Sequence, residues 1–226
     1  MSVMYLALRT RPDILQQVSY IASNITNREK WVHIHKQLII IATILRNTPD
    51  KYLIFRRAEE HMVVGYADAS FITHEDGKSH TGFSIWLSNR FNTAAIIVKS
   101  HKQVTVSASS TEAELIAGHE ATRNLIWAKD IITFLDNTYD NKPVILHQDN
   151  KSAVCIIKYK YTNKNSRFIN VKYLSTRDLL ENKLLTIVWV KGSQMWADVL
   201  TKPVTKSKYD QCITRIMGTY EEDKEK

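Results

Sequence analysis

Four acidic residues stand at the expected ends of helices and strands, where they could hold divalent metal ions together. Asp68 ends a predicted strand at 62–68, and Asp149 follows another at 143–147. Glu114 and Asp198 lie near the starts of predicted helices at 111–135 and 194–201. A lone Asp at a strand end often only forms a turn. Four acids in this recurring context indicate instead a metal site assembled from distant parts of the chain.

The chemistry of such a site follows from its ligand type. Four carboxylates close together repel one another and raise each other's pKa, and divalent cations remove that conflict. Ligation by oxygen alone suits Mg²⁺ or Mn²⁺ rather than zinc. Two such ions about 3.5–4 Å apart can activate a water and stabilise the leaving oxygen of a phosphodiester. The net charge of +8 favours a polyanionic partner, so phosphodiester hydrolysis is the best match.

The long helix carries two glutamates, and helical geometry distinguishes them. At 100° per residue, Glu114 shares a small apolar face with Ala117, Ala121 and Leu125. Glu112 lies on a polar face, where an acid in the first turn complements the helix dipole. We therefore expect Glu114 to point toward the strand ends and Glu112 toward water.

The composition is that of a soluble globular chain of 226 residues, long enough for one domain and an appendage. Cys155 and Cys212 have no metal-binding spacing, and we interpret both as reduced thiols of an intracellular protein, cytoplasmic or nuclear and not secreted. The most apolar run, 38–45, is far shorter than the roughly 20 residues of a membrane span, so no membrane partner is expected.

The pattern of elements predicts an α/β fold. Before residue 58 we expect helices at 14–25 and 30–45 and a short strand at 52–55. After it we expect strands at 62–68, 82–87, 94–98, 143–147 and 185–190, and helices at 111–135, 150–158, 171–181 and 194–201. Sequential strands pair as an antiparallel meander, and strand–helix–strand segments add parallel strands. The result is a mixed five-stranded sheet flanked by helices, whose first and fourth strands place Asp68 beside Asp149.

The same pattern divides the chain into three segments. Residues 1–58 form a small helical segment, 59–203 form the sheet domain, and 204–226 form a polar C-terminal tail that ends in six charged residues.

The four acids lie within four sequence motifs: GYADAS (65–70), SASSTEAELIA (107–117), QDNKSA (148–153) and WADVLTKP (196–203). In order and spacing they resemble the ribonuclease H domain of copia-type LTR retrotransposon Pol polyproteins. Residues 4–14 resemble the segment after the polymerase palm, so 1–58 would be a remnant of the reverse transcriptase C-terminal region.

The resemblance implies a ribonuclease-H-like fold and a metal-dependent endonuclease that cleaves the RNA strand of RNA–DNA hybrids. It implies two Mg²⁺ ions, or Mn²⁺, held by Asp68, Glu114, Asp149 and Asp198 as catalytic metal ligands. The implied partners are the hybrid and the remainder of a reverse transcriptase.

The chain also departs from the family pattern. The paired aspartates of the polymerase are absent, so no DNA synthesis is expected. Residues 167–174 lack the two histidines and the Asp of the usual KHIDIRYH stretch, and the loop 191–194 has Ser193 where cellular relatives often have His. The alternative is therefore a catalytically silent remnant, or a co-opted module that binds nucleic acid or protein without cleaving.

Basic residues after the third acid are candidates for phosphate contacts: Lys151, Lys158, Lys160, Lys164 and Arg167. An ordinary solvated basic face explains them equally well. We expect Tyr66 and Trp196 to pack near the site rather than to stack on bases.

Overall fold

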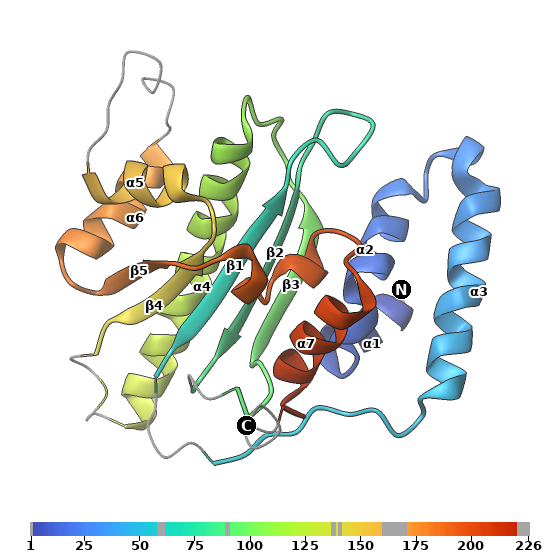
Figure 1. The fold of residues 1–226 in the computed structure, drawn as a ribbon, viewed down its shortest axis with the longest axis horizontal. Coiled ribbons are helices and arrows are strands. Elements are labelled where there is room, and N and C mark those ends of the chain that lie inside the picture. Colours follow the sequence, from blue (N-terminus) through green and yellow to red (C-terminus); the bar gives the residue numbers. More distant parts are fainter. Residues whose placement is uncertain are drawn as a thin grey trace.

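The computed structural model describes residues 2–57, 62–88, 91–136, 139, 142–159 and 171–220. Its centre is a sheet in the order β3-β2-β1-β4-β5 (Figure 1). The strands are β1 (Val64–Ser70), β2 (His80–Trp86), β3 (Ile97–Lys102), β4 (Val144–Gln148) and β5 (Leu185–Trp189). β2 is antiparallel to β1 and β3, whereas β4 is parallel to β1 and β5. The predicted mixed five-stranded sheet, with its first strand beside the fourth, is confirmed.

One face of the sheet is covered by α4 (Ser110–Leu135), with α5 (Lys151–Tyr159) and α6 (Val171–Glu181) beside it. The buried face of α4 is the one predicted, since Ala117, Ala121 and Leu125 are fully buried. The helix lies close to β1 because Gly65 has no side chain, and a Cβ there would lie 3.1 Å from Leu125 Cδ2. This close approach fixes the start of α4, and therefore Glu114, relative to the end of β1.

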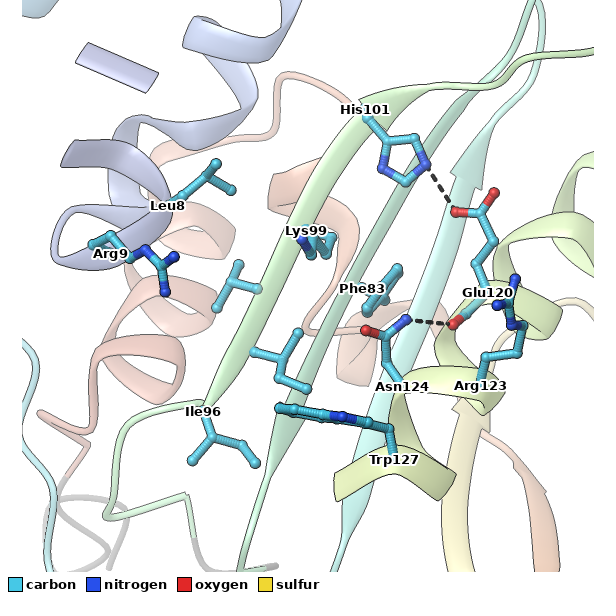
Figure 2. Close-up of a pocket in the computed structure, with 12 residues that line it drawn as sticks. Leu8, Arg9, Phe83, Ile96, Lys99, His101, Glu120, Arg123, Asn124 and Trp127 are labelled. Atoms are coloured by element: carbon cyan, nitrogen blue, oxygen red, sulfur yellow. Dashed lines mark hydrogen bonds and ion pairs between the residues drawn. The ribbon is translucent and has the colours of Figure 1, made fainter. Parts of the chain in front are cut away.

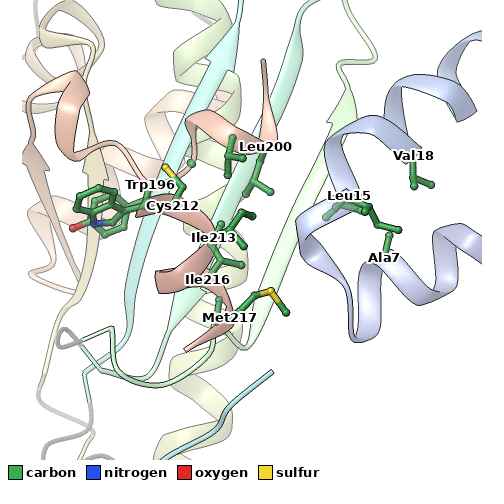
Figure 3. Close-up of a cluster of buried hydrophobic side chains, with 14 of the residues drawn as sticks. Ala7, Leu15, Val18, Trp196, Leu200, Cys212, Ile213, Ile216 and Met217 are labelled. Carbon is green, nitrogen blue, oxygen red and sulfur yellow. The ribbon is translucent and has the colours of Figure 1, made fainter. Parts of the chain in front are cut away.

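The opposite face is covered by α7 (Lys206–Met217), which the sequence analysis missed. Cys212, Ile213, Ile216 and Met217 of this helix are buried, and Figure 3 shows them in one cluster with Trp196 and Leu200. The predicted polar tail is therefore wrong for residues 206–217. The helix is amphipathic, and its four apolar residues lie on one face among charged neighbours. Residues 221–226 lie outside the described residues.

The N-terminal helices α1 (Ser2–Arg9), α2 (Leu15–Asn24) and α3 (Trp31–Asn47) belong to the same side of the molecule. Ala7 and Leu15 are fully buried in the cluster that contains α7. The Tyr209 hydroxyl of α7 donates to the Asp13 carbonyl over 2.9 Å. These contacts attach the first helices to the sheet domain, while the boundary proposed at residue 58 stays a prediction.

Three predicted elements differ from the structure. The strand expected at 94–98 begins only at Ile97, because the Ala94 and Ala95 amides bind the carbonyls of Ile54 and Ile216. Residues 52–55 are not a strand, although the Ile54 amide binds the Met217 carbonyl. The helix expected at 194–201 is two single 3₁₀ turns, η5 (Gly192–Gln194) and η6 (Asp198–Leu200).

Candidate metal centre

Three aspartates meet at the carboxyl ends of β1 and β4. Asp68 lies in β1, Asp149 follows β4, and Asp198 is the first residue of η6. Each offers an oxygen atom, and these atoms all lie within 4.8 Å of one another. Asp68 and Asp198 are 1% and 7% exposed, whereas Asp149 is half-buried. The cluster therefore has two buried carboxylates and one that reaches solvent.

Glu114 approaches the cluster from the start of α4. Its side chain is buried, and Gln148 Nε2 donates to the Glu114 carbonyl over 2.7 Å and to its Oε2 over 3.3 Å. Burial raises the pKa of Glu114 well above its usual value, and the charges of Asp68 and Asp149 raise it further. Glu114 thus interacts electrostatically with Asp68 and Asp149, which agrees with the helical face predicted for it.

Glu112 has a separate, local role. The Ala108 amide donates to Glu112 Oε2 over 2.7 Å, and Ser109 Oγ accepts from the Glu112 amide over 3.1 Å. This is a reciprocal cap of the helix start. The prediction that Glu112 is a helix-start acid rather than a site residue agrees with these contacts.

The proximity and burial of these acids alter their pKa values. Burial raises the pKa of Asp68 to about 6, and the charges of Asp198 and Asp149 add to the increase, against the effect of Lys202. Burial, followed by the charge of Asp198, also raises the pKa of Asp149. Asp68, Glu114 and Asp149, whose raised pKa values show that ionisation is unfavourable, form a donor set that a divalent cation stabilises. The residues present therefore fit a hard oxygen-ligated metal.

Three further residues in this site were not singled out from the sequence. The Thr201 hydroxyl donates to Asp68 Oδ2. Lys202 Nζ lies 2.7 Å from Asp198 Oδ1 and 3.4 Å from Asp68 Oδ2. Lys208 Nζ lies 3.5 Å from Asp198 Oδ2. The sequence spacing could have indicated two of them, because Thr201 and Lys202 follow Asp198 by three and four residues, about one helical turn.

The loop after β5 borders the cluster. A Cβ placed on Gly192 would lie 3.7 Å from Asp149 Oδ2, so the backbone of η5 passes directly beside this carboxylate. Lys208 Nζ donates to the carbonyls of Gly192 and Ser193, each over 2.8 Å. The loop that carries Ser193 is therefore held against the site.

The proposed phosphate contacts are only partly described. Lys151 and Lys158 are exposed on α5, and Lys151 Nζ lies 4.5 Å from the centre of the Trp189 ring. Lys160, Lys164 and Arg167 lie outside the described residues, as do residues 167–170 of the altered stretch. The role of all five in binding nucleic acid stays a prediction.

The aromatic residues near the site are packed into the core. Tyr66 is 6% exposed and stacks on His147 with ring centres 4.3 Å apart. Trp196 is 9% exposed, and the Arg215 guanidinium lies 4.0 Å from its ring centre. Both side chains support the site from within, as expected.

A cavity of about 800 Å³ lies elsewhere, between α1 and α4 over β2 and β3 (Figure 2). Leu8, Lys99 and Trp127 are among its lining residues, and His101 pairs with Glu120 at 2.8 Å beside it. Its lining residues include neither the three clustered aspartates nor Glu114. Within the described residues, no helix combines the length and apolarity that a membrane crossing demands.

Comparison with known proteins adds sequence relatives. The Pol polyprotein of transposon TNT 1-94 from Nicotiana tabacum is 29% identical over 214 residues, 93% of this chain and 15% of the relative. The Ty1-GR1 Gag-Pol polyprotein of Saccharomyces cerevisiae is 29% identical over 207 residues, 88% of this chain and 11% of the relative. The secreted RxLR effector protein 161 of Plasmopara viticola is 30% identical over 128 residues, 56% of this chain and 85% of that protein. The chain thus spans a small part of the polyproteins.

Solved structures give a weaker likeness. The N-terminal RNase H domain of a Mycobacterium tuberculosis protein matches 69% of this chain and 98% of its own, with a TM-score of 0.46 and 14% identity. LC11-RNase H1, solved in complex with an RNA/DNA hybrid, covers 67% of this chain and 99% of its own, with a TM-score of 0.43 and 15% identity. No family model matches. The chain is thus similar in sequence, over nearly all of its length, to Pol polyproteins of plant and yeast retrotransposons that include copia-type elements.

Proposed function

We propose that this chain is a Mg²⁺-dependent ribonuclease H that cleaves the RNA strand of RNA–DNA hybrids. The observation that carries the proposal is the meeting of Asp68, Asp149 and Asp198 oxygens within 4.8 Å, with Glu114 beside them. The carboxylates of Asp68, Asp149 and Asp198 converge at one sheet edge, and Glu114 interacts with two of them. Burial, followed by mutual repulsion, raises the pKa values of Asp68, Glu114 and Asp149. Such an arrangement is costly without a cation, so its function is to hold one.

The chain's own residues would divide the work as follows. Asp68, Glu114, Asp149 and Asp198 would hold two Mg²⁺ ions, or Mn²⁺, which when bound supply an activated water and stabilise the leaving oxygen. The Thr201 hydroxyl fixes the orientation of the Asp68 carboxylate. Lys208 holds the loop of Gly192 and Ser193 against the open side of the cluster. The positive net charge of the chain favours the polyanionic hybrid as substrate.

The alternative is a module that binds nucleic acid or protein without cleaving it. A relative whose name describes an effector is 30% identical to this chain over 128 residues, so a similar sequence occurs outside polyproteins. All four acids are present here, however, and they form the converging arrangement described above. We therefore favour the enzyme, with the hybrid and the remainder of a reverse transcriptase as its partners.

The test uses the purified chain, a hybrid labelled on the RNA strand, and Mg²⁺ or Mn²⁺. We expect RNA cleavage that chelation stops, an intact DNA strand, and no primer extension. Asp149→Asn should abolish cleavage, because it removes the carboxylate that borders solvent, while the exposed Asp130→Asn on α4 should retain it. Equal cleavage by Asp149→Asn and the parent would refute the site. Hybrid binding by the parent without cleavage in either metal would establish the alternative.

A further inference from the structure

A lysine side chain lies inside the proposed metal site. Lys202 Nζ is 2.7 Å from Asp198 Oδ1 and 3.4 Å from Asp68 Oδ2, so a single ammonium group bridges two of the three clustered aspartates. A divalent cation held by the same two carboxylates would need the same oxygen atoms. An ammonium group and a metal ion cannot both take that place, because two cations at such short separation repel strongly.

The Lys202 side chain can leave the site because it is partly exposed to solvent. Its side chain is 42% exposed, whereas those of Asp68 and Asp198 are 2% and 10% exposed. Lys202 follows η6, and its long flexible stem can turn toward solvent without moving the backbone. The carboxylates are buried and the lysine is not, so the lysine is the partner with room to move.

Lys208 provides the internal comparison. Its ammonium also approaches Asp198, at 3.5 Å, but it donates to the carbonyls of Gly192 and Ser193, each over 2.8 Å. Its side chain is only 16% exposed, and Nζ lies 5.1 Å from the centre of the Trp196 ring. Lys208 is therefore a fixed part of the loop, and Lys202 is the exchangeable cation.

We propose that Lys202 is a built-in counter-cation that holds the metal-free site together and is displaced when divalent metal binds. The proposal rests on the metal site put forward above. It makes Lys202 a competitor that weakens metal affinity, because the apparent affinity falls with the fraction of molecules in which the lysine occupies the site. It also makes the lysine a stabiliser of the metal-free protein, because without it two buried carboxylates have no cation between them.

The experiment compares the parent chain with Lys202→Met, which keeps the length of the stem and removes the charge. Calorimetric titration with Mg²⁺ and Mn²⁺ measures affinity, and thermal unfolding with and without metal measures stability. We expect Lys202→Met to unfold at lower temperature in chelator and to bind metal at least about threefold more tightly. The rise in unfolding temperature on adding metal should therefore be larger than in the parent. Lys202→Arg keeps a cation and should stay closer to the parent in both measurements.

Lys206→Met is the matched control, because Lys206 is exposed at the start of α7. It should leave metal affinity and unfolding temperature unchanged. Equal or weaker metal binding by folded Lys202→Met would overturn the counter-cation role while leaving the metal site standing. Failure of both the parent and Lys202→Met to bind Mg²⁺ or Mn²⁺ would overturn the metal site and the inference together.

Discussion

Replacing Asp68 should abolish cleavage yet stabilise the metal-free protein at neutral pH. The pKa of Asp68 is raised from 3.8 to about 6, first by burial. The stability that this carboxyl group contributes is fully present below its unfolded pKa and is lost as the pH rises through its folded pKa. A pKa increase of this size corresponds to about 3 kcal/mol of lost stability above about pH 6.

Asp68→Asn removes that loss because an amide does not ionise. For a chain of 226 residues, about 3 kcal/mol corresponds to a rise in unfolding temperature of roughly 6–12 °C. The raised pKa already includes the attraction between Asp68 and Lys202, which opposes the effect of burial. The pKa values of Glu114 and Asp149 are raised too, so the parent itself should lose stability as the pH rises.

The assay is thermal unfolding in chelator at about pH 5 and about pH 7.5, which lie on either side of the raised pKa. The parent should unfold at lower temperature at the higher pH, and Asp68→Asn should reduce this difference. Saturating Mg²⁺ should stabilise the parent and not the variant. Asp130→Asn, on the exposed side of α4, controls for general charge effects. A variant less stable than the parent at the higher pH in chelator would refute the reasoning.

Two further predictions concern cleavage. Glu114→Gln should abolish cleavage, because this buried side chain interacts with Asp68 and Asp149. Glu112→Gln should retain most of the cleavage and lose only part of a helix cap, about 1 kcal/mol of stability. Hybrid cleavage by both variants is the measurement, and the reverse result would mean that α4 presents Glu112 to the site. Ser193→His should raise multiple-turnover rate, because the neighbouring Gly192 lies against Asp149 and an imidazole can move protons near neutral pH. The increase in rate should be smaller than the roughly 10²–10⁴-fold contributed by a full general acid or base. If the folded variant has an unchanged rate and unchanged metal dependence, proton transfer at this loop does not limit turnover.

The sequence determined the sheet and the acids that gather at its edge. The strand and helix order predicted an antiparallel meander followed by parallel strands, with the first strand beside the fourth if the first strand is central in the sheet. Asp68 and Asp149 are neighbours on that condition, and the structure places β1 in the centre of the sheet. The 100° rotation between successive helical residues then separated Glu114 from Glu112, because burial of one face of α4 is a local property of the helix.

Tertiary structure decided what lies between those acids. The spacing of Lys202 from Asp198 is a local signal, but only the fold shows that Lys202 also reaches Asp68 and that Lys208 holds the loop of Gly192. Ion pairs of this kind depend on the approach of segments far apart in the chain. No local pattern encodes the distance between η6 and the end of β1.

The same reason explains α7 and the missed strand boundary. Pro203 and the charged C-terminal residues suggested a solvated tail, yet the apolar face of Lys206–Met217 packs on the sheet. Residues 94 and 95 have strand-forming neighbours, but their amides bind Ile54 and Ile216 instead of a neighbouring strand. Local propensity fixes which segments can be helices or strands, whereas the partners available in the folded chain decide where each one ends and what it covers.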